Sequence, residues 1–168
     1  MIYLAHGASG NATSMQPHVD GLRGRGLSAA TVQLPRGAAE RAIDPYRAQV
    51  ADYADAIIGG HSFGGRVASM LAAQESPRAL ILLSYPLHRP GRPDEQRTAH
   101  WPQIQCPVLL LSGESDPFAR IDLLRAAVHI LLSAELFSYP GVGHGLVRVL
   151  DDALDRIAVF VSGLPPQD

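Results

Sequence analysis

The sequence predicts an α/β fold, a doubly wound and mostly parallel sheet of about six strands with helices on both faces. Two observations support this prediction. Short apolar runs rich in Ile, Leu and Val recur along the chain, and segments with apolar residues at helical spacing separate most of them. When strands and helices alternate in this way, successive strands run parallel and the connecting helices cover the two faces of the sheet.

Each apolar run is continuous rather than alternating, which is typical of strands buried on both faces. The predicted strands are Ile2–Ala5, Ala30–Leu34, Ala56–Gly59, Ala79–Ser84, Val108–Ser112 and Ala134–Ser138. The predicted helices are Ser14–Gly24, Pro45–Ala54, Gly64–Gln74, Arg120–Leu132 and Gly145–Val161. The connection from Tyr85 to Gln105 is rich in proline and shows no helical stripe, so a long loop is predicted there.

The size, charge and composition of the chain limit the kinds of protein it can be. With 168 residues, of which 46% are hydrophobic, the sequence fits one domain over residues 1–168, with a loose tail over residues 163–168. The formal net charge is -2 and the basic residues are spread along the chain, which argues against a nucleic acid or a membrane surface as partner. All 14 Lys+Arg residues are arginine, so chemistry that needs a lysine, such as a Schiff base or a P-loop, is excluded.

The amino end and the cysteine content favour a cytoplasmic protein. The segment Met1–Ala5 is one short apolar run without the basic region of a signal peptide, and no run reaches the length of a membrane span. The single cysteine, Cys106, cannot form an internal disulfide. It stands at the start of a predicted strand, where we expect it to be part of the core.

The pentapeptide Gly60–Gly64, Gly-His-Ser-Phe-Gly, lies between a predicted strand and a predicted helix. A G-x-S-x-G pattern arises by chance in about one such chain in ten, but strand, sharp turn and helix is the order that a nucleophile elbow requires. Glycine at Gly60 and Gly64 leaves room for the strained turn. We therefore expect Ser62 to be a nucleophile, with the N–H of Phe63 directed at a developing oxyanion. The alternative is a serine that caps the following helix.

A base and an acid for Ser62 follow in the loops after two later strands. Asp116 comes after the fifth predicted strand and His144 after the sixth. Parallel strands place these loops at the same edge of the sheet as Ser62, and the chain order Ser, Asp, His is the order that accompanies such an elbow. Glu114 lies in the same loop as Asp116 and is the alternative to it.

The loop after the first strand, His6–Gly10, is where a second oxyanion donor would come from, and we expect the N–H of Ala8 to be that donor. His6 and His61 stand within motifs, but loop packing and hydrogen bonding explain them better than catalysis. No pair of histidines has the spacing of metal ligands, and no dinucleotide fingerprint follows the first strand. We therefore expect no metal and no cofactor.

Together these motifs resemble the α/β-hydrolase superfamily, and more closely its small, capless dienelactone-hydrolase-like group of bacterial proteins. The likeness runs from Ile2 to about Val161 and rests on five segments: His6–Ala8, Gly59–Ser69, Ser84–His88, Gly113–Phe118 and Gly143–Gly145. It implies a minimal α/β-hydrolase fold without a cap domain and a serine esterase that transfers an acyl group to water. Dienelactone hydrolases carry Cys at the nucleophile position, whereas this chain has Ser62, which favours an ordinary ester over a dienelactone.

The substrate side of the site is less defined. Loops that leave the carboxyl ends of strands surround the ligand in open α/β sheets, so we expect Tyr85, Pro86, Leu87 and His88 to border the cavity. Of these, Tyr85, Leu87 and His88, together with Phe118, should contact a small ester. Without a cap the site should be open and should favour short acyl chains. Most members of the superfamily have further strands before the oxyanion loop. The edge that this chain leaves unpaired there favours a homodimer as an alternative to a monomer.

Two other functions stay open from the sequence. A hydrolase fold can serve as a catalytically weak or inactive binding or scaffold module, because a fold does not fix a function. The same triad can also act on thioesters or peptides, since only the pocket distinguishes these substrates from esters.

Overall fold

Six parallel strands form one sheet in the computed structural model of the protein, which describes residues 1–166. The strands are β1 (Ile2–Ala5), β2 (Ala29–Val32), β3 (Ile57–His61), β4 (Ala79–Leu83), β5 (Val108–Gly113) and β6 (Ala134–Tyr139). Their order across the sheet is β2-β1-β3-β4-β5-β6, and each neighbouring pair is parallel. The six predicted strands are confirmed, with small shifts at their ends.

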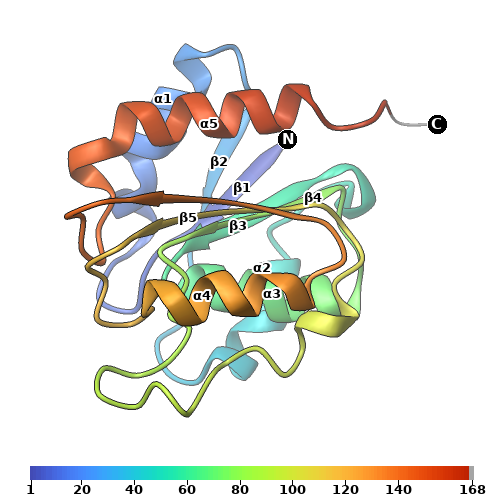
Figure 1. Ribbon diagram of the computed structural model, residues 1–168. Coiled ribbons are helices and arrows are strands. Elements are labelled where there is room, and N and C mark those ends of the chain that lie inside the picture. Colours follow the sequence, from blue (N-terminus) through green and yellow to red (C-terminus); the bar gives the residue numbers. More distant parts are fainter. Residues whose placement is uncertain (167–168) are drawn as a thin grey trace.

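Helices cover both faces of this sheet (Figure 1). On one face lie α1 (Gln16–Gly24) and α5 (Leu150–Ser162), and on the other lie α2 (Ile43–Arg47), α3 (Phe63–Gln74) and α4 (Ile121–Ala127). The 3-10 turns are Ala12–Met15, Ala39–Ala42, Tyr53–Asp55, Trp101–Gln103, Val128–Ile130 and Val147–Val149. The doubly wound α/β fold predicted from the alternation of strands and helices is confirmed, and the described residues show no cap.

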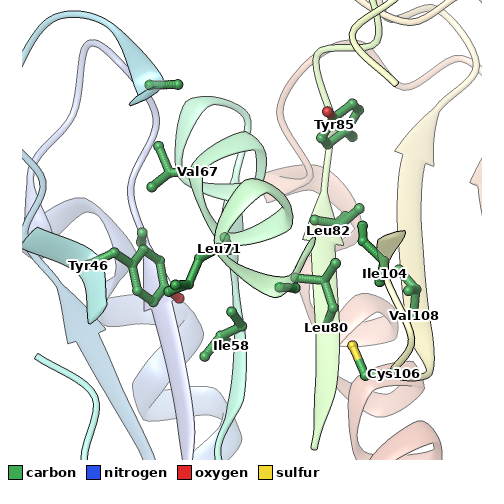
Figure 2. Close-up of a cluster of buried hydrophobic side chains, with 14 of the residues drawn as sticks. Tyr46, Ile58, Val67, Leu71, Leu80, Leu82, Tyr85, Ile104, Cys106 and Val108 are labelled. Atoms are coloured by element: carbon green, nitrogen blue, oxygen red, sulfur yellow. The ribbon is translucent and has the colours of Figure 1, made fainter. Parts of the chain in front are cut away.

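Strand β4 shows how the sheet divides the core. Its side chains alternate: Leu80 and Leu82 belong to the cluster shown in Figure 2, which packs against α2, α3 and α4, whereas Ile81 and Leu83 pack toward α1 and α5. Every residue of β4 is buried, which is why the strand is a continuous apolar run in the sequence. Cys106 lies in the same cluster as Leu80, as expected, and burial raises the pKa of its thiol to about 12.

Tyr46 on α2 joins two strands that carry parts of the candidate site. Its buried hydroxyl oxygen lies 2.8 Å from the carbonyl oxygen of Tyr3 in β1 and 2.7 Å from that of Gly59 in β3. The N–H of Gly59 also donates to this hydroxyl, over 2.9 Å. Because the carboxyl ends of β1 and β3 lead into the oxyanion loop and the elbow, this phenol helps to fix both loops from below.

The helix predicted over Pro45–Ala54 is wrong in extent. Helix α2 ends at Arg47, and the chain turns at Asp52, which has a φ of 43°. This turn lets Tyr53 enter the core and returns the chain to the start of β3. Packing of Tyr53 has overridden the helical spacing of the sequence, as tertiary contacts often do with helix propensity.

The other predicted helices are present with changed ends. The first begins as a 3-10 turn, the fourth ends as one, and the fifth becomes an α-helix only at Leu150. The predicted long loop between β4 and β5 contains a single 3-10 turn, Trp101–Gln103, within the described residues.

The chain continues past the end of α5 (Figure 1). Leu164 packs against the cluster between the sheet and α5, and Arg78 donates a hydrogen bond to the carbonyl oxygen of Pro165 over 3.3 Å. Residues 167–168, the last two of the predicted loose tail, lie outside the described residues. Among residues 1–166, no helix is both long enough and apolar enough to cross a membrane.

Candidate active site

Ser62 occupies the turn between β3 and α3 in a strained conformation, with φ of 51° and ψ of -113°. A serine with this φ lies outside the regions that side chains normally allow, which is a mark of functional turns. At this turn the backbone of the elbow packs directly against the backbone at the end of β1. A Cβ atom at Gly60 or at Gly64 would lie 2.4 Å from the carbonyl oxygen of Ala5. Glycine at these two positions therefore lets β1, the elbow and α3 pack together.

Three side chains from separate loops form a hydrogen-bonded chain at this turn. His144 Nε2 lies 2.8 Å from Ser62 Oγ, and His144 Nδ1 lies 2.8 Å from Asp116 Oδ2. A carboxylate only accepts hydrogen bonds, so Nδ1–H donates to Asp116 and Nε2 is free to accept from the Ser62 hydroxyl. This is the arrangement in which an imidazole can remove a proton from a serine.

Asp116 is held in place from behind. Its side chain is 0% exposed, and its second oxygen, Oδ1, accepts a hydrogen bond from the N–H of Phe118 over 2.8 Å. The ring of Phe118 in turn lies against that of His144, with 4.4 Å between the ring centroids. Carboxylate and imidazole are thus fixed by a backbone donor and an aromatic neighbour as well as by each other.

Glu114, the alternative to Asp116, turns away from the histidine. Its Oε1 accepts hydrogen bonds from Ser138 Oγ over 2.6 Å and from Arg125 Nη2 over 2.9 Å. These partners lie in β6 and α4, and the carboxylate that contacts His144 is that of Asp116.

Ala8 and Phe63, the two residues predicted to supply oxyanion donors, line the same cavity as Ser62. Phe63 is the first residue of α3, and neither its N–H nor that of Ala8 donates a hydrogen bond within residues 1–166. The oxyanion loop touches the elbow: a Cβ atom at Gly7 would lie 3.7 Å from Cβ of Ser62. Two unpaired backbone donors beside a nucleophile are what an oxyanion hole needs.

The histidines in the motifs hold loops. His61 Nε2–H donates to the carbonyl oxygen of His144 over 2.9 Å, and burial lowers the pKa of the His61 imidazole. His6 Nε2 accepts the N–H of Leu34 over 3.0 Å and so joins the oxyanion loop to the segment after β2. On α1, burial and then the nearby His61 lower the pKa of His18 to about 4, so this ring is neutral at pH 7.

A cavity of about 950 Å³ opens above Ser62. Of the predicted site residues, Ala8, Ser62, Phe63, Phe118 and His144 line it. Asp116 lies behind His144.

The expectation that Tyr85, Leu87 and His88 contact substrate is not met, because all three side chains are buried beneath the cavity wall. The Tyr85 ring packs on Trp101 with 5.1 Å between centroids. His88 Nδ1–H donates to the carbonyl oxygen of Arg89, and His88 Nε2 accepts the N–H of Arg120. These residues shape the loop from inside.

Pro86 lines the cavity, as expected. Sequence reasoning missed other lining residues, among them Arg66, Arg89 and Arg97. Arg66 had a usable signal, because it follows Ser62 by four residues on a predicted helix and so shares its face. Arg89 and Arg97 lie in the long loop between β4 and β5, where no periodicity indicates direction. Within residues 1–166, no group of three or more His, Cys, Asp or Glu side chains is arranged to hold a metal ion.

Solved structures share this fold at low sequence identity. The putative non-heme bromoperoxidase BpoC from Mycobacterium tuberculosis H37Rv matches with a TM-score of 0.85 at 13% identity, over 98% of this chain and 92% of that one. Monoacylglycerol lipase from Paleococcus ferrophilus matches with a TM-score of 0.82 at 14% identity, over 98% and 94%. Est1E from Butyrivibrio proteoclasticus, in a structure with bound ferulic acid, matches with a TM-score of 0.76 at 17% identity, over 97% and 88%. At such identities the likeness shows the fold alone.

The sequence itself gives the family. A model of the α/β hydrolase domain matches residues 1–151, a range that includes Ser62, Asp116 and His144. This match agrees with the resemblance to the α/β-hydrolase superfamily that the elbow and the histidine loop indicate. The chain belongs to the α/β-hydrolase domain family.

Proposed function

We propose that the protein is a serine hydrolase that cleaves a small carboxylic ester, with Ser62 as nucleophile, His144 as general base and Asp116 as the residue that orients it. The observation that carries the proposal is the hydrogen-bonded chain through Ser62, His144 and Asp116 at the strained elbow, with 2.8 Å at each link. A serine that only caps a helix has no need of an imidazole held by a buried carboxylate.

The reaction follows from these contacts. His144 Nε2 takes the proton from Ser62 Oγ as this oxygen attacks the ester carbonyl, and Nδ1–H stays bonded to Asp116. The N–H groups of Ala8 and Phe63 stabilise the oxyanion, and each such donor contributes about 3 kcal/mol in comparable sites. His144 then gives the proton to the leaving alcohol. Water, activated by the same imidazole, attacks the acyl-enzyme and releases the acid.

The test is labelling with a fluorophosphonate, which reacts with an activated serine. The intact protein should gain the mass of one phosphonyl group on the peptide that contains Ser62. Ser62→Ala should abolish both the label and the hydrolysis of 4-nitrophenyl butyrate, while its circular dichroism spectrum stays that of the parent. A folded protein that does not react at Ser62 would instead support the alternative of an inactive binding module.

We expect the protein to prefer esters with short acyl chains. No cap covers the cavity in the described residues, which fits the capless dienelactone-hydrolase-like group, and we infer a preference for short acyl chains. A series of 4-nitrophenyl esters from acetate to decanoate tests this point: kcat/KM should be highest for the short esters, and a maximum at decanoate would overturn the inference.

A further inference from the structure

Three arginines that the hydrolytic chemistry does not use face the candidate active-site cavity. Arg66 comes from the first turns of α3, and Arg89 and Arg97 come from the loop between β4 and β5. The backbone N–H of Arg66 donates to the carbonyl oxygen of Ser62 over 3.0 Å, so this arginine begins one helical turn above the nucleophile.

The positive charges of this group are not balanced within the cavity. The carboxylate among its lining residues is that of Glu40, which pairs with Arg66 over 3.1 Å and whose side chain is 58% exposed. Arg66 Nε is buried and has no hydrogen-bond partner among residues 1–166. Arg97 donates to the carbonyl oxygen of Pro86 over 3.4 Å and has no ion pair within the same residues.

Arg66 and Arg89 also lie close enough to act on Arg97. Burial, and after it the charges of Arg66 and Arg89, lower the pKa of the Arg97 guanidinium. Like charges that converge on one space are unfavourable unless an anion joins them, and the planar guanidinium fork matches carboxylate and phosphate oxygens.

We propose that the cavity binds an ester that carries an anionic group, a carboxylate or a phosphate, and that Arg66, Arg89 and Arg97 hold this group while Ser62 attacks the ester carbonyl. The inference rests on the proposed function, because it assigns the substrate class of the same site. It goes beyond that function in that the chemistry alone would serve neutral esters equally well.

Matched pairs of esters test it. In the first pair the charge lies on the acyl side: mono-4-nitrophenyl adipate against its neutral methyl ester. In the second it lies on the alcohol side: 4-(butyryloxy)benzoate against its methyl ester. The phosphate analogue of the second acid, 4-(butyryloxy)phenyl phosphate, decides between the two anions. For at least one pair, kcat/KM should favour the anion by about tenfold or more at low ionic strength, and 0.5 M NaCl should reduce the preference.

Single substitutions show which arginines cause the preference for anionic esters. Arg97→Gln and Arg89→Gln should each lower the ratio of anionic to neutral kcat/KM by about 3- to 10-fold, the loss expected for one hydrogen bond in an open site. Arg89 is exposed, so its variant tests the proposal even where replacement of Arg97 disturbs the loop. Glu40→Gln should raise the ratio, because it removes the competing carboxylate. Arg92→Gln is the matched control, since Arg92 lies in the same loop, pairs with Glu95 and does not line the cavity.

The outcomes separate the two proposals. No label at Ser62 and no turnover of any ester would overturn the proposed function. Labelling and turnover without a preference for either anion would overturn only the present inference. A fall of the ratio in Arg92→Gln as large as in Arg89→Gln would also overturn it, because the effect would then come from net charge rather than from the cavity.

Discussion

The two walls of the cavity are built in different ways. The inner wall consists of Ala8, Ser62, Phe63 and His144, in turns that directly follow β1, β3 and β6. The outer wall consists of Glu40, Pro86, Arg89 and Arg97, in the connections after β2 and β4. In the inner wall the Ser62 and His144 side chains are hydrogen-bonded in the chain that ends at Asp116, whereas Arg89 and Arg97 of the outer wall form no ion pair among the described residues.

The outer wall is held from beneath by buried polar side chains. The Tyr85 hydroxyl donates to the carbonyl oxygen of Arg97 over 2.6 Å, and His88 joins Arg89 to the backbone of Arg120. His100 and Ser69 join the same loop to α3 over 2.8 Å. The difference suggests that the sheet fixes the reaction geometry, while a few side-chain hydrogen bonds fix the recognition of substrate.

The largest expected effect is a loss of activity at the inner wall, in the variant Asp116→Asn. An asparagine amide would donate to His144 Nδ1 and place the imidazole proton on Nε2, where it can no longer accept from Ser62. We expect kcat for 4-nitrophenyl butyrate to fall by about 10⁴-fold, as in other enzymes with this triad.

Glu114→Gln is the matched control for Asp116→Asn, because Glu114 is an acid of the same loop whose side chain bonds, among the described residues, to Ser138 and Arg125 and not to His144. Surface ion pairs of this kind contribute little to stability, so the loop should keep its shape and kcat should change by less than about threefold. Equal losses in the two variants would show that the loop, and not the Asp116 carboxylate, is what the reaction needs.

The close packing of β1 and α3 behind the inner wall predicts the next largest effect, a loss of stability in Gly64→Ala. In Gly64→Ala the new methyl group would lie 2.4 Å from the carbonyl oxygen of Ala5, so β1 and α3 must move apart. We expect the free energy of unfolding to fall by about 3 kcal/mol. In Gly24→Ala, at the end of α1, the methyl group meets no atom within 4 Å, and stability should be unchanged or slightly higher. Urea unfolding of both variants measures the difference.

The same contrast explains what the sequence alone could predict. Ser62, Asp116 and His144 each stand just after a recognisable strand, so the parallel topology brings them to one edge whatever the detailed path of the loops. Tyr85 stands at an equivalent place, but Ser84 before it adopts a φ of 48°, and the Tyr85 ring turns into the core beside Trp101.

The direction of a loop side chain depends on such turns, which have no periodic signal in the sequence. For this reason the sequence favours Tyr85, Leu87 and His88 at the outer wall, where the structure has Arg89 and Arg97, although Pro86 of the same loop lines the cavity as expected. The extent of α2 was missed for a similar reason: the need to bury Tyr53 ends a helix that local spacing would continue.

A smaller effect is expected where the outer wall is anchored. Tyr85→Phe keeps the ring in the core and removes the hydroxyl that donates to the Arg97 carbonyl. The loss of one buried hydrogen bond should lower the free energy of unfolding by about 1–2 kcal/mol. Urea unfolding measures this change. An unchanged stability would mean that the loop holds Arg97 without this anchor, and the contrast between the two walls would weaken.

The smallest effect concerns the pH dependence of stability. It depends on His100, which joins the loop between β4 and β5 to α3. Burial, and then the charge of Arg66, lower the pKa of His100 to about 4, whereas the unfolded chain has the ordinary value of 6.5. Between these values the unfolded state binds the extra proton, so stability must fall as the pH drops from 6.5 toward 4 and should be fully present above 6.5. His18, with the same direction and value, adds to this fall.

His100→Gln should therefore flatten the pH dependence by about 1 kcal/mol between pH 7 and pH 4.5, a figure reduced for the partial exposure of the ring. Glutamine is uncharged at both pH values, and its amide N–H can still donate to Ser69 Oγ, whose hydroxyl donates to the carbonyl oxygen of Arg66. Urea unfolding of parent and variant at the two pH values measures the change. Identical slopes would show that the ring is as free to take a proton in the folded protein as in the unfolded chain. In that case the outer loop would rest on α3 less closely than its 2.8 Å contact to Ser69 implies, and the arginines it carries would be less firmly placed over Ser62.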